Sequence, residues 1–378
     1  MSQAILDLKQ EAQANPTAID AFLEKHDFPL VEGRSVTFVF RGQADAVLLR
    51  HWIYGLPSSR EFERLPGSDL WFLIHELPAR SRVEYKLELH QGKNKHLVRD
   101  PLNPHEARDP YGANSVVHGE GYQLPEWTAH DANARPGEII KRQLNSSTFG
   151  DVRPLSIYKP ARFRETRRYP LLVVHDGLDY LRFASLQTVL DNLIHRLEIP
   201  PIIVALTQSP NRLHEYADDP RHADFIVDEL LPLITNEFPL VDDPAARSLV
   251  GASFGAVAAL STAVRKPGVF GNLLLQSGSF AFTDIGDHDR GPVFDPVVKF
   301  VNDFREQPTK PAARIFLTCG TYESLIYYSR SLLPLLQSTG AEVRYEESRD
   351  GHNWENWRDR LRDGLTWLAP GPLWMVYE

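Results

Sequence analysis

The chain has 378 residues, of which 42% are hydrophobic and 24% charged, a composition typical of globular proteins with a large core. Its formal net charge of −9 disfavours nucleic acid and anionic membranes as partners, because both require a basic surface. Segment 1–16 lacks the pattern of a signal peptide, and no apolar run approaches the ~20 residues needed to cross a bilayer, so we expect a soluble, cytoplasmic protein.

The length favours two domains, and the first part of the chain has a β-rich pattern. Residues 1–30 are expected to form a short helical lead-in. Short strands with no helix between them then predict an all-β, immunoglobulin-like sandwich over residues 1–130. The polar, Gly- and Pro-bearing segment from residue 99 to about 136 is interpreted as the edge of this domain and a linker. The expected strands are 36–40, 47–54, 71–74 and 83–89.

Strand and helix patterns alternate over residues 131–378, which predicts a mainly parallel sheet flanked by helices. Pro232 is expected to kink the helix at 224–238, because its ring removes a backbone donor. Residues 281–310 break the alternation and are interpreted as an insertion. The expected strands are 171–174, 202–206, 247–250, 272–275, 314–317 and 343–346, and the expected helices are 186–197, 224–238, 254–264, 324–337 and 354–368.

Gly251-Ala252-Ser253-Phe254-Gly255 fits the pattern G-x-S-x-G between a predicted strand and a predicted helix. This is the context of a nucleophile elbow, a sharp turn that lifts a serine hydroxyl above a sheet. Because a serine alcohol needs a base to become a good nucleophile, a histidine is expected further along the chain. Ser253 is therefore the candidate nucleophile of an α/β-hydrolase fold.

His352 follows the last predicted strand, where the general base of this fold belongs. Glu323 follows the preceding strand and is the candidate acid that orients the imidazole. An alternative role for Glu323 is to cap the next helix, and Asp287, Asp289 and Asp295 are rival acids.

Two backbone donors are needed for the oxyanion. One is expected from Phe254, directly after the candidate nucleophile. The second is expected from Gly177 or Leu178, in the loop after strand 171–174.

The segment 211–224 is rich in potential metal ligands, but it has no compact spacing of two histidines on a helix. We favour a structural interpretation, in which Arg212 pairs with Glu215 and either Asp219 or Asp224 caps the next helix. No metal and no cofactor are therefore expected.

The second domain resembles the putative esterase family, which includes enterochelin (enterobactin) esterases, feruloyl esterases, acetyl-xylan esterases and mycolyltransferases. The resemblance rests on His175-Asp176-Gly177, 251–255, Gln276-Ser277-Gly278-Ser279 and Asp350-Gly351-His352. The first domain, with Trp71 and Asp100-Pro101-Leu102-Asn103-Pro104, resembles the sandwich that precedes the catalytic domain of enterochelin esterases. Two motifs depart from the usual enterochelin esterase pattern, GASFGA for GQSFGG and DGH for GGH.

The resemblance implies a serine carboxylic-ester hydrolase with Ser253 as nucleophile, His352 as base and Glu323 as acid. We expect a small-molecule or glycan ester as substrate, most readily an enterochelin-like ester. Feruloyl or acetyl ester hydrolysis, acyl transfer to a carbohydrate, and a non-catalytic glycan- or partner-binding protein with a vestigial site are the alternatives. The sequence predicts no oligomeric state.

Overall fold

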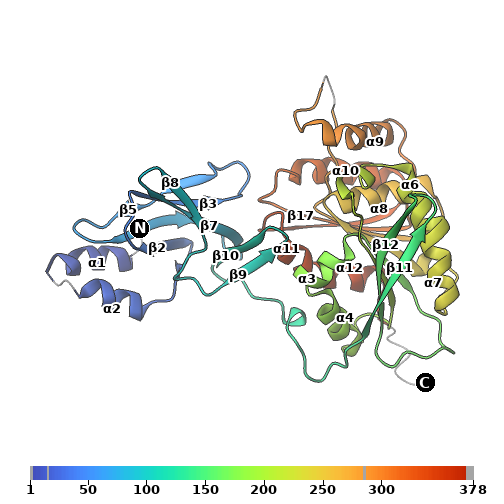
Figure 1. Cartoon of the computed structure of the whole chain (residues 1–378), viewed down its shortest axis with the longest axis horizontal. Coiled ribbons are helices and arrows are strands. Elements are labelled where there is room, and N and C mark those ends of the chain that lie inside the picture. Colours follow the sequence, from blue (N-terminus) through green and yellow to red (C-terminus); the bar gives the residue numbers. More distant parts are fainter. Residues whose placement is uncertain (1–2, 15–16, 284–286, 372–378) are drawn as a thin grey trace. The chain divides into compact units, whose positions relative to one another are not determined.

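The computed structural model describes residues 3–14, 17–283 and 287–371, and the chain divides into two compact units (Figure 1). The first unit contains the chain up to Leu124 together with Gly320–Ser324 and Ser348–Asn353. The second contains Pro125–Cys319, Leu325–Glu347 and the chain from Trp354 onward. Two short segments from late in the sequence thus belong to the same unit as the N-terminal strands.

The first unit is a β-sandwich, as the sequence predicted. Four strands pair in the order β1-β2-β6-β5, and a second sheet has the order β4-β3-β7-β10-β9, with β8 also on β7. Apolar side chains such as Phe38, Leu49 and Leu87 are buried in one cluster that draws on both sheets. The strands are β1 (Leu30–Glu32), β2 (Ser35–Arg41), β3 (Ala46–His51), β4 (Ser59–Glu61), β5 (Glu63–Arg64), β6 (Leu70–Glu76), β7 (Arg82–Gln91), β8 (Asn94–Val98), β9 (Glu106–Asp109) and β10 (Gly112–His118).

Two helices, α1 (Gln3–Ala14) and α2 (Ala18–Lys25), form the expected helical lead-in. Their apolar residues share a second buried cluster with Val39 and Phe72 of β2 and β6. Since side chains alternate along a strand, these residues lie on the face of the four-stranded sheet opposite to Phe38. Residues 1–2 and 15–16 of the lead-in lie outside the described residues.

Two strands lie within residues 99–136, which the sequence indicated only as domain edge and linker. β9 and β10 are strands of the second sheet, and β10 pairs with β7 through Val117 and Val83. Val116 and Val117 are both buried. The polar flanks of this strand concealed it, because its place in the sheet depends on a partner some thirty residues earlier in the chain.

The second unit has an eight-stranded sheet with the order β11-β12-β14-β13-β15-β16-β17-β18. The pairs from β14 through β13, β15 and β16 to β17 are parallel, and the hairpin of β11 and β12 joins β14 in antiparallel fashion. The strands are β11 (Glu138–Ser146), β12 (Asp151–Lys159), β13 (Leu171–Val174), β14 (Ile203–Thr207), β15 (Arg247–Ala252), β16 (Asn272–Gln276), β17 (Arg314–Gly320) and β18 (Glu342–Ser348).

Helices cover both faces of this sheet (Figure 1). Alternate residues of β13 show the division: Leu171 and Val173 pack with α7 to α10, whereas Leu172 and Val174 pack with α3, α4 and α12. The sequence thus correctly predicted a mainly parallel sheet flanked by helices. The helices are α3 (Gly177–Phe183), α4 (Leu186–His195), α5 (Arg212–Glu215), α6 (Pro220–Asp224), α7 (Leu231–Glu237), α8 (Phe254–Arg265), α9 (Asp295–Glu306), α10 (Ile326–Ser338), α11 (Trp354–Asp359) and α12 (Leu361–Leu368).

The single helix expected at 224–238 is instead composed of three pieces. A π-helical stretch, η2 (Phe225–Leu230), separates α6 from α7, and Pro232 lies in the first turn of α7. Proline has no N–H for the carbonyl of Asp228, which explains why the regular helix is interrupted just before it. The expected insertion at 281–310 contains α9, and its residues 284–286 lie outside the described residues. Across the part of the chain that the structure describes, no helix has the length and apolar content needed to cross a bilayer.

Candidate active site

Ser253 lies in a strained turn between β15 and α8. Its φ and ψ are 57° and −122°, which residues with a side chain rarely adopt and which costs about 1–3 kcal/mol. Close packing requires glycine at position 251. A Cβ on Gly251 would lie 2.1 Å from the carbonyl oxygen of Gly255, so only glycine fits there. This geometry is that of the nucleophile elbow predicted from the motif.

The segment Gln276-Ser277-Gly278-Ser279 holds the elbow from the neighbouring strand end. The Ser253 amide donates to the Gln276 carbonyl at 2.9 Å, and the Ser279 amide donates to the Ser253 carbonyl at 3.2 Å. The hydroxyl of Ser253 lies 3.2 Å from that of Ser279. These bonds fix the backbone on both sides of the strained residue.

A buried side-chain network supports this segment in turn. The Tyr180 hydroxyl donates to Gln276 Oε1 at 2.7 Å, and Gln276 Nε2 donates to the Trp357 carbonyl at 2.8 Å. Trp357 Nε1 then donates to Ser277 Oγ at 3.0 Å. Gln276 and Ser277 appeared in the sequence only as part of a family resemblance, and their supporting role was missed because it depends on α3 and α11.

The candidate oxyanion loop packs directly against the elbow. A Cβ on Gly177 would lie 2.5 Å from Leu206 Cα, so glycine is required where β13 leads into α3. The position of a Cβ on Gly255 is 3.3 Å from His175 Cβ and 3.5 Å from Asp176 Oδ2. His175 and Asp176, directly before Gly177, therefore lie beside the elbow.

Arg212 forms an ion pair with Asp176, and the predicted pairing with Glu215 was wrong. Arg212 Nε and Nη2 lie 2.9 and 2.8 Å from Asp176 Oδ2. Burial raises the pKa of Asp176, and Arg212 opposes that rise. Glu215 instead binds Arg153 at 2.6 Å. The predicted cap was correct for Asp219, whose Oδ1 accepts from the Arg221 amide at 3.0 Å.

His222, from the segment rich in potential metal ligands, is hydrogen-bonded to His175, which lies next to Gly255 of the elbow. His175 Nδ1 must donate to the Val250 carbonyl at 2.9 Å, because a carbonyl only accepts. Its Nε2 therefore accepts from His222 Nε2 at 3.0 Å, and burial holds the pKa of both imidazoles low, that of His175 at about 4. Among the described residues, no three His, Cys, Asp or Glu side chains are grouped so that they could hold a metal ion.

Glu323 and His352 are brought together as the sequence predicted. His352 Nδ1 lies 2.7 Å from Glu323 Oε2, and Glu323 Oε1 accepts from the Gly320 amide at 2.7 Å. The Glu323 side chain is 0% exposed, whereas that of His352 is 38% exposed. Because a carboxylate only accepts, the neutral imidazole carries its proton on Nδ1 and keeps Nε2 as an acceptor.

The rival acids lie in other surroundings. Asp295 binds His288 Nε2 at 2.9 Å, and Asp287 and Asp289 are exposed. Glu323 and His352 belong to the first unit, whereas Ser253 and the loop at 175–178 belong to the second. That Ser253 and His352 act together in one reaction is therefore a proposal.

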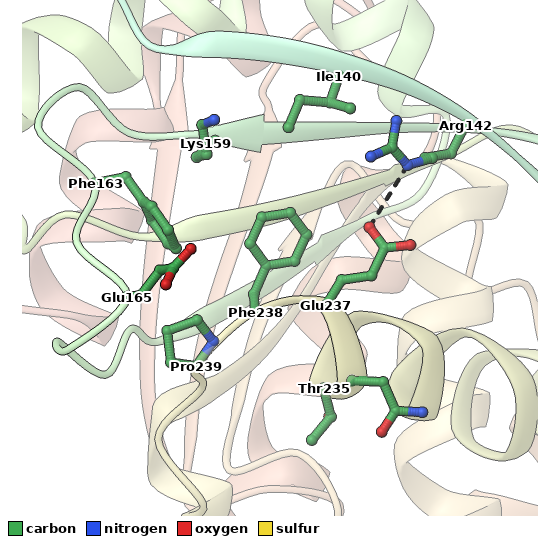
Figure 2. A pocket seen from close by; sticks show the side chains of 10 residues that line it. Ile140, Arg142, Lys159, Phe163, Glu165, Thr235, Glu237, Phe238 and Pro239 are labelled. Carbon is green, nitrogen blue, oxygen red and sulfur yellow. Dashed lines mark ion pairs between the residues drawn. The ribbon is translucent and has the colours of Figure 1, made fainter.

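A pocket elsewhere in the second unit lies between the hairpin of β11 and β12 and the end of α7 (Figure 2). An ion pair of 3.5 Å between Arg142 and Glu237 crosses it. Phe163 and Phe238 contribute aromatic rings that meet edge to face. None of the candidate catalytic residues lines this pocket.

Comparison with known proteins identifies the family. The model of the family described as "Putative esterase" matches residues 146–368, more than half of the chain. The chain belongs to this esterase family. It is therefore an esterase-type hydrolase.

Similar proteins agree with this assignment. An iron(III) enterobactin esterase from Escherichia coli O6:H1 strain CFT073 is 26% identical over 333 residues, which cover 81% of each chain. The solved structure of a Shigella flexneri enterobactin esterase in the presence of enterobactin has a TM-score of 0.75 and 22% identity, and covers 92% of this chain and 97% of its own. A ferulic acid esterase has a TM-score of 0.54 and 18% identity, and covers 62% of this chain and 98% of its own. These likenesses confirm the α/β-hydrolase fold preceded by a β-sandwich.

Proposed function

We propose that this esterase is a serine carboxylic-ester hydrolase that works through an acyl-enzyme. Ser253 is the nucleophile, His352 the general base and Glu323 the acid that orients it. The observation that carries the proposal is the strained conformation of Ser253 at the start of α8, which three hydrogen bonds to the 276–279 segment hold in place. Strained conformations of non-glycine residues cluster at active sites.

His352 accepts and returns the proton in both halves of the reaction. As Ser253 Oγ bonds to the ester carbonyl carbon, His352 Nε2 takes the hydroxyl proton. The bond from that carbon to the alkoxy oxygen then breaks, and His352 returns the proton to the departing alcohol. A water molecule next attacks the acyl carbon and gives a proton to His352. The bond from that carbon to Ser253 Oγ then breaks, and His352 returns the proton to Oγ, which releases the acid and the free serine. The mechanism requires no metal and no cofactor.

Backbone amides are proposed to bind the oxyanion. The Phe254 amide begins α8, where the helix dipole favours negative charge. A second donor is proposed from Gly177 or Leu178, in the loop that packs on the elbow. Two such donors stabilise the charge that forms on the carbonyl oxygen in the transition state.

An enterobactin-like ester is the proposed substrate, with a feruloyl, acetyl or other carboxylic ester as the alternative. The enterobactin esterases match this chain over both the sandwich and the hydrolase part, whereas the ferulic acid esterase matches only 62% of the chain. We interpret the sandwich as an immunoglobulin-like domain ending near residue 130, ahead of a catalytic domain. Its presence favours enterobactin-like substrates over the compact feruloyl type.

A panel of esters tests the proposal: ferric and iron-free enterobactin, a feruloyl ester and a p-nitrophenyl ester. Wild-type protein should hydrolyse at least one of them, and Ser253→Ala should lower kcat by ~10³-fold or more while the fold remains intact. A fluorophosphonate should label Ser253 alone. Activity should fall in acid, because a protonated imidazole can no longer accept the serine proton.

Near wild-type turnover by Ser253→Ala would overturn the mechanism. Added glycerol or trehalose distinguishes hydrolysis from acyl transfer, because a transferase would divert the acyl group to the added alcohol. Loss of activity with EDTA that a divalent ion restores would contradict the metal-free mechanism. A protein that binds glycans but hydrolyses none of the esters would support the vestigial-site alternative.

A further inference from the structure

Arg82, at the start of β7, binds both ends of the short segment that carries His352. Its side chain is 0% exposed. Arg82 Nη1 donates to Asp350 Oδ1 at 3.2 Å and to Asn353 Oδ1 at 3.0 Å. One guanidinium nitrogen therefore holds the residues on either side of Gly351 and His352.

The segment is tied together by its own bonds as well. Asp350 Oδ1 accepts from the Gly351 amide at 2.7 Å and from Asn353 Nδ2 at 2.8 Å. The main chain adds a further link, because the Arg82 amide donates to the Arg349 carbonyl at 2.9 Å. Arg82 thus anchors a segment whose own hydrogen bonds already meet at Asp350.

Two strands of the sandwich fix Arg82 in return. Arg82 Nη2 donates to Glu84 Oε1 at 3.0 Å, and Glu84 Oε2 accepts from Asn114 Nδ2 of β10 at 2.7 Å. The buried guanidinium lies between two carboxylates, those of Asp350 and Glu84, as a buried charge must to remain ionised. Burial raises the pKa of Asp350 to about 7, and Arg82 is the main group that opposes this rise.

The segment that carries Glu323 is attached to the same part of the sandwich. The Tyr322 hydroxyl lies 2.5 Å from Ser81 Oγ, next to Arg82. The Tyr322 carbonyl accepts from the Tyr54 amide at 2.8 Å, and the Tyr322 amide donates to the Asp350 carbonyl at 3.1 Å. Both members of the Glu323–His352 pair are therefore positioned from the sandwich.

We propose that Arg82 is a positioning residue for ester hydrolysis, holding the 350–353 segment so that the His352 imidazole stays on Glu323 with Nε2 available. The inference rests on the function proposed above and gives the sandwich a direct part in catalysis. A base must be held within about 0.5 Å of its productive position, and supporting hydrogen bonds provide that precision. Without the Arg82 side chain the reacting groups all remain, but the segment that carries His352 loses its side-chain anchor to the sandwich.

The test uses the full chain and a p-nitrophenyl ester. Arg82→Met should lower kcat by ~10²-fold and leave KM within ~3-fold, because the contact acts on the reaction step and not on substrate binding. Arg82→Lys should recover ~10-fold of the loss, since an ammonium keeps the charge but not the forked geometry. Equal kcat values for wild type and a folded Arg82→Met would overturn the inference.

Two control variants separate positioning from stability. Arg60→Met makes the same substitution at a guanidinium that contacts His75 and not the catalytic segments. Phe22→Ala removes a buried ring of α2 from the cluster on the far face of the four-stranded sheet, which contains no residue of those segments. Both should keep wild-type kcat, even though Phe22→Ala lowers the melting temperature. A fall in kcat with Phe22→Ala equal to that of Arg82→Met would show that stability alone is responsible.

A second background tests whether Arg82 acts through His352. In His352→Ala protein, adding Arg82→Met should cost no further activity, because residues that act as a unit are non-additive. A further ~10²-fold loss in that background would overturn the inference. If Arg82→Met does not fold, Asn353→Ala replaces it as the test. We expect this variant to have a kcat ~10-fold below that of wild type at an unchanged KM. A wild-type kcat would overturn the inference. Full activity of Ser253→Ala would instead overturn the proposed function itself.

Discussion

Glu323→Gln tests the acid of the proposed triad with a nearly isosteric change. The Glu323 carboxylate accepts two donors at 2.7 Å, His352 Nδ1 and the Gly320 amide. A glutamine has only one acceptor oxygen, so it cannot satisfy both. If that oxygen stays on Gly320, the amide NH₂ faces Nδ1, and the imidazole must move its proton to Nε2. Nε2 can then no longer accept a proton from Ser253.

The opposite orientation of the glutamine also has a cost. The NH₂ would face the Gly320 N–H in a position that is fully buried, and two donors would be left without an acceptor. Loss of the orienting carboxylate costs ~10⁴-fold in rate in a well-studied serine protease triad, which corresponds to ~5 kcal/mol. We expect at least ~10²-fold here, or ~2.7 kcal/mol, because water can partly support the half-exposed imidazole.

The measurement is kcat on a p-nitrophenyl ester, with circular dichroism to confirm folding. Asp295→Asn is the matched control, since Asp295 is a carboxylate that contacts a different histidine, His288. It should keep wild-type kcat, as should the corresponding changes at Asp287 and Asp289. A folded Glu323→Gln protein within ~3-fold of wild-type kcat, or a larger loss with any of the three aspartate variants, would refute the assignment of Glu323.

Further predictions concern the elbow and the response to acid. Gly251→Ala should abolish activity and expression of folded protein, because its Cβ would lie 2.1 Å from a carbonyl oxygen; Gly255→Ala, whose nearest neighbour is 3.3 Å away, should fold and keep measurable turnover. Glu229 is partly desolvated, which raises its pKa, but hydrogen bonds from Ser147, Ser146 and Thr148 outweigh this and hold the pKa at about 2. The ionised Glu229 therefore contributes to stability above about pH 4.5, and this contribution is lost as the pH falls toward 2. In Glu229→Gln protein, the free energy of unfolding measured with urea should depend less on pH over that range. A pH dependence equal to that of wild type would contradict this.

The central strands of the second unit could be predicted well from sequence. β13 was predicted at 171–174, where the structure has it, and the other parallel strands lie within a few residues of their predicted positions. Strands buried on both faces appear as unbroken apolar runs, so their composition alone is informative. β11 was missed because it lies at the edge of the sheet and carries mostly polar residues, and only its nine-residue pairing with β12 reveals it.

In the candidate site too, features set by neighbouring residues could be predicted, whereas contacts between residues far apart in the sequence could not. The elbow at Ser253 depends on five consecutive residues, and the order of Glu323 and His352 follows from the order of strands, so both could be predicted. The ion pairs around them could not. The partners are far apart in the sequence: 36 residues separate Arg212 from Asp176, 62 separate Arg153 from Glu215, and 268 separate Arg82 from Asp350. Local spacing favoured Glu215 for Arg212, and only the folded chain shows that Asp176 is the partner.

The proposed reacting groups are fixed by two separate hydrogen-bond networks. Ser253 is held in the second unit by the 276–279 segment, which Tyr180 and Trp357 support. Glu323 and His352 are held in the first unit, where Arg82 and Tyr322 connect their segments to the sandwich. The strained serine and the buried carboxylate each require such support, because neither conformation is stable on its own. In the proposed mechanism, a chain without the sandwich keeps His352 and Glu323 but loses the contacts from Arg82 and Ser81 that hold their segments.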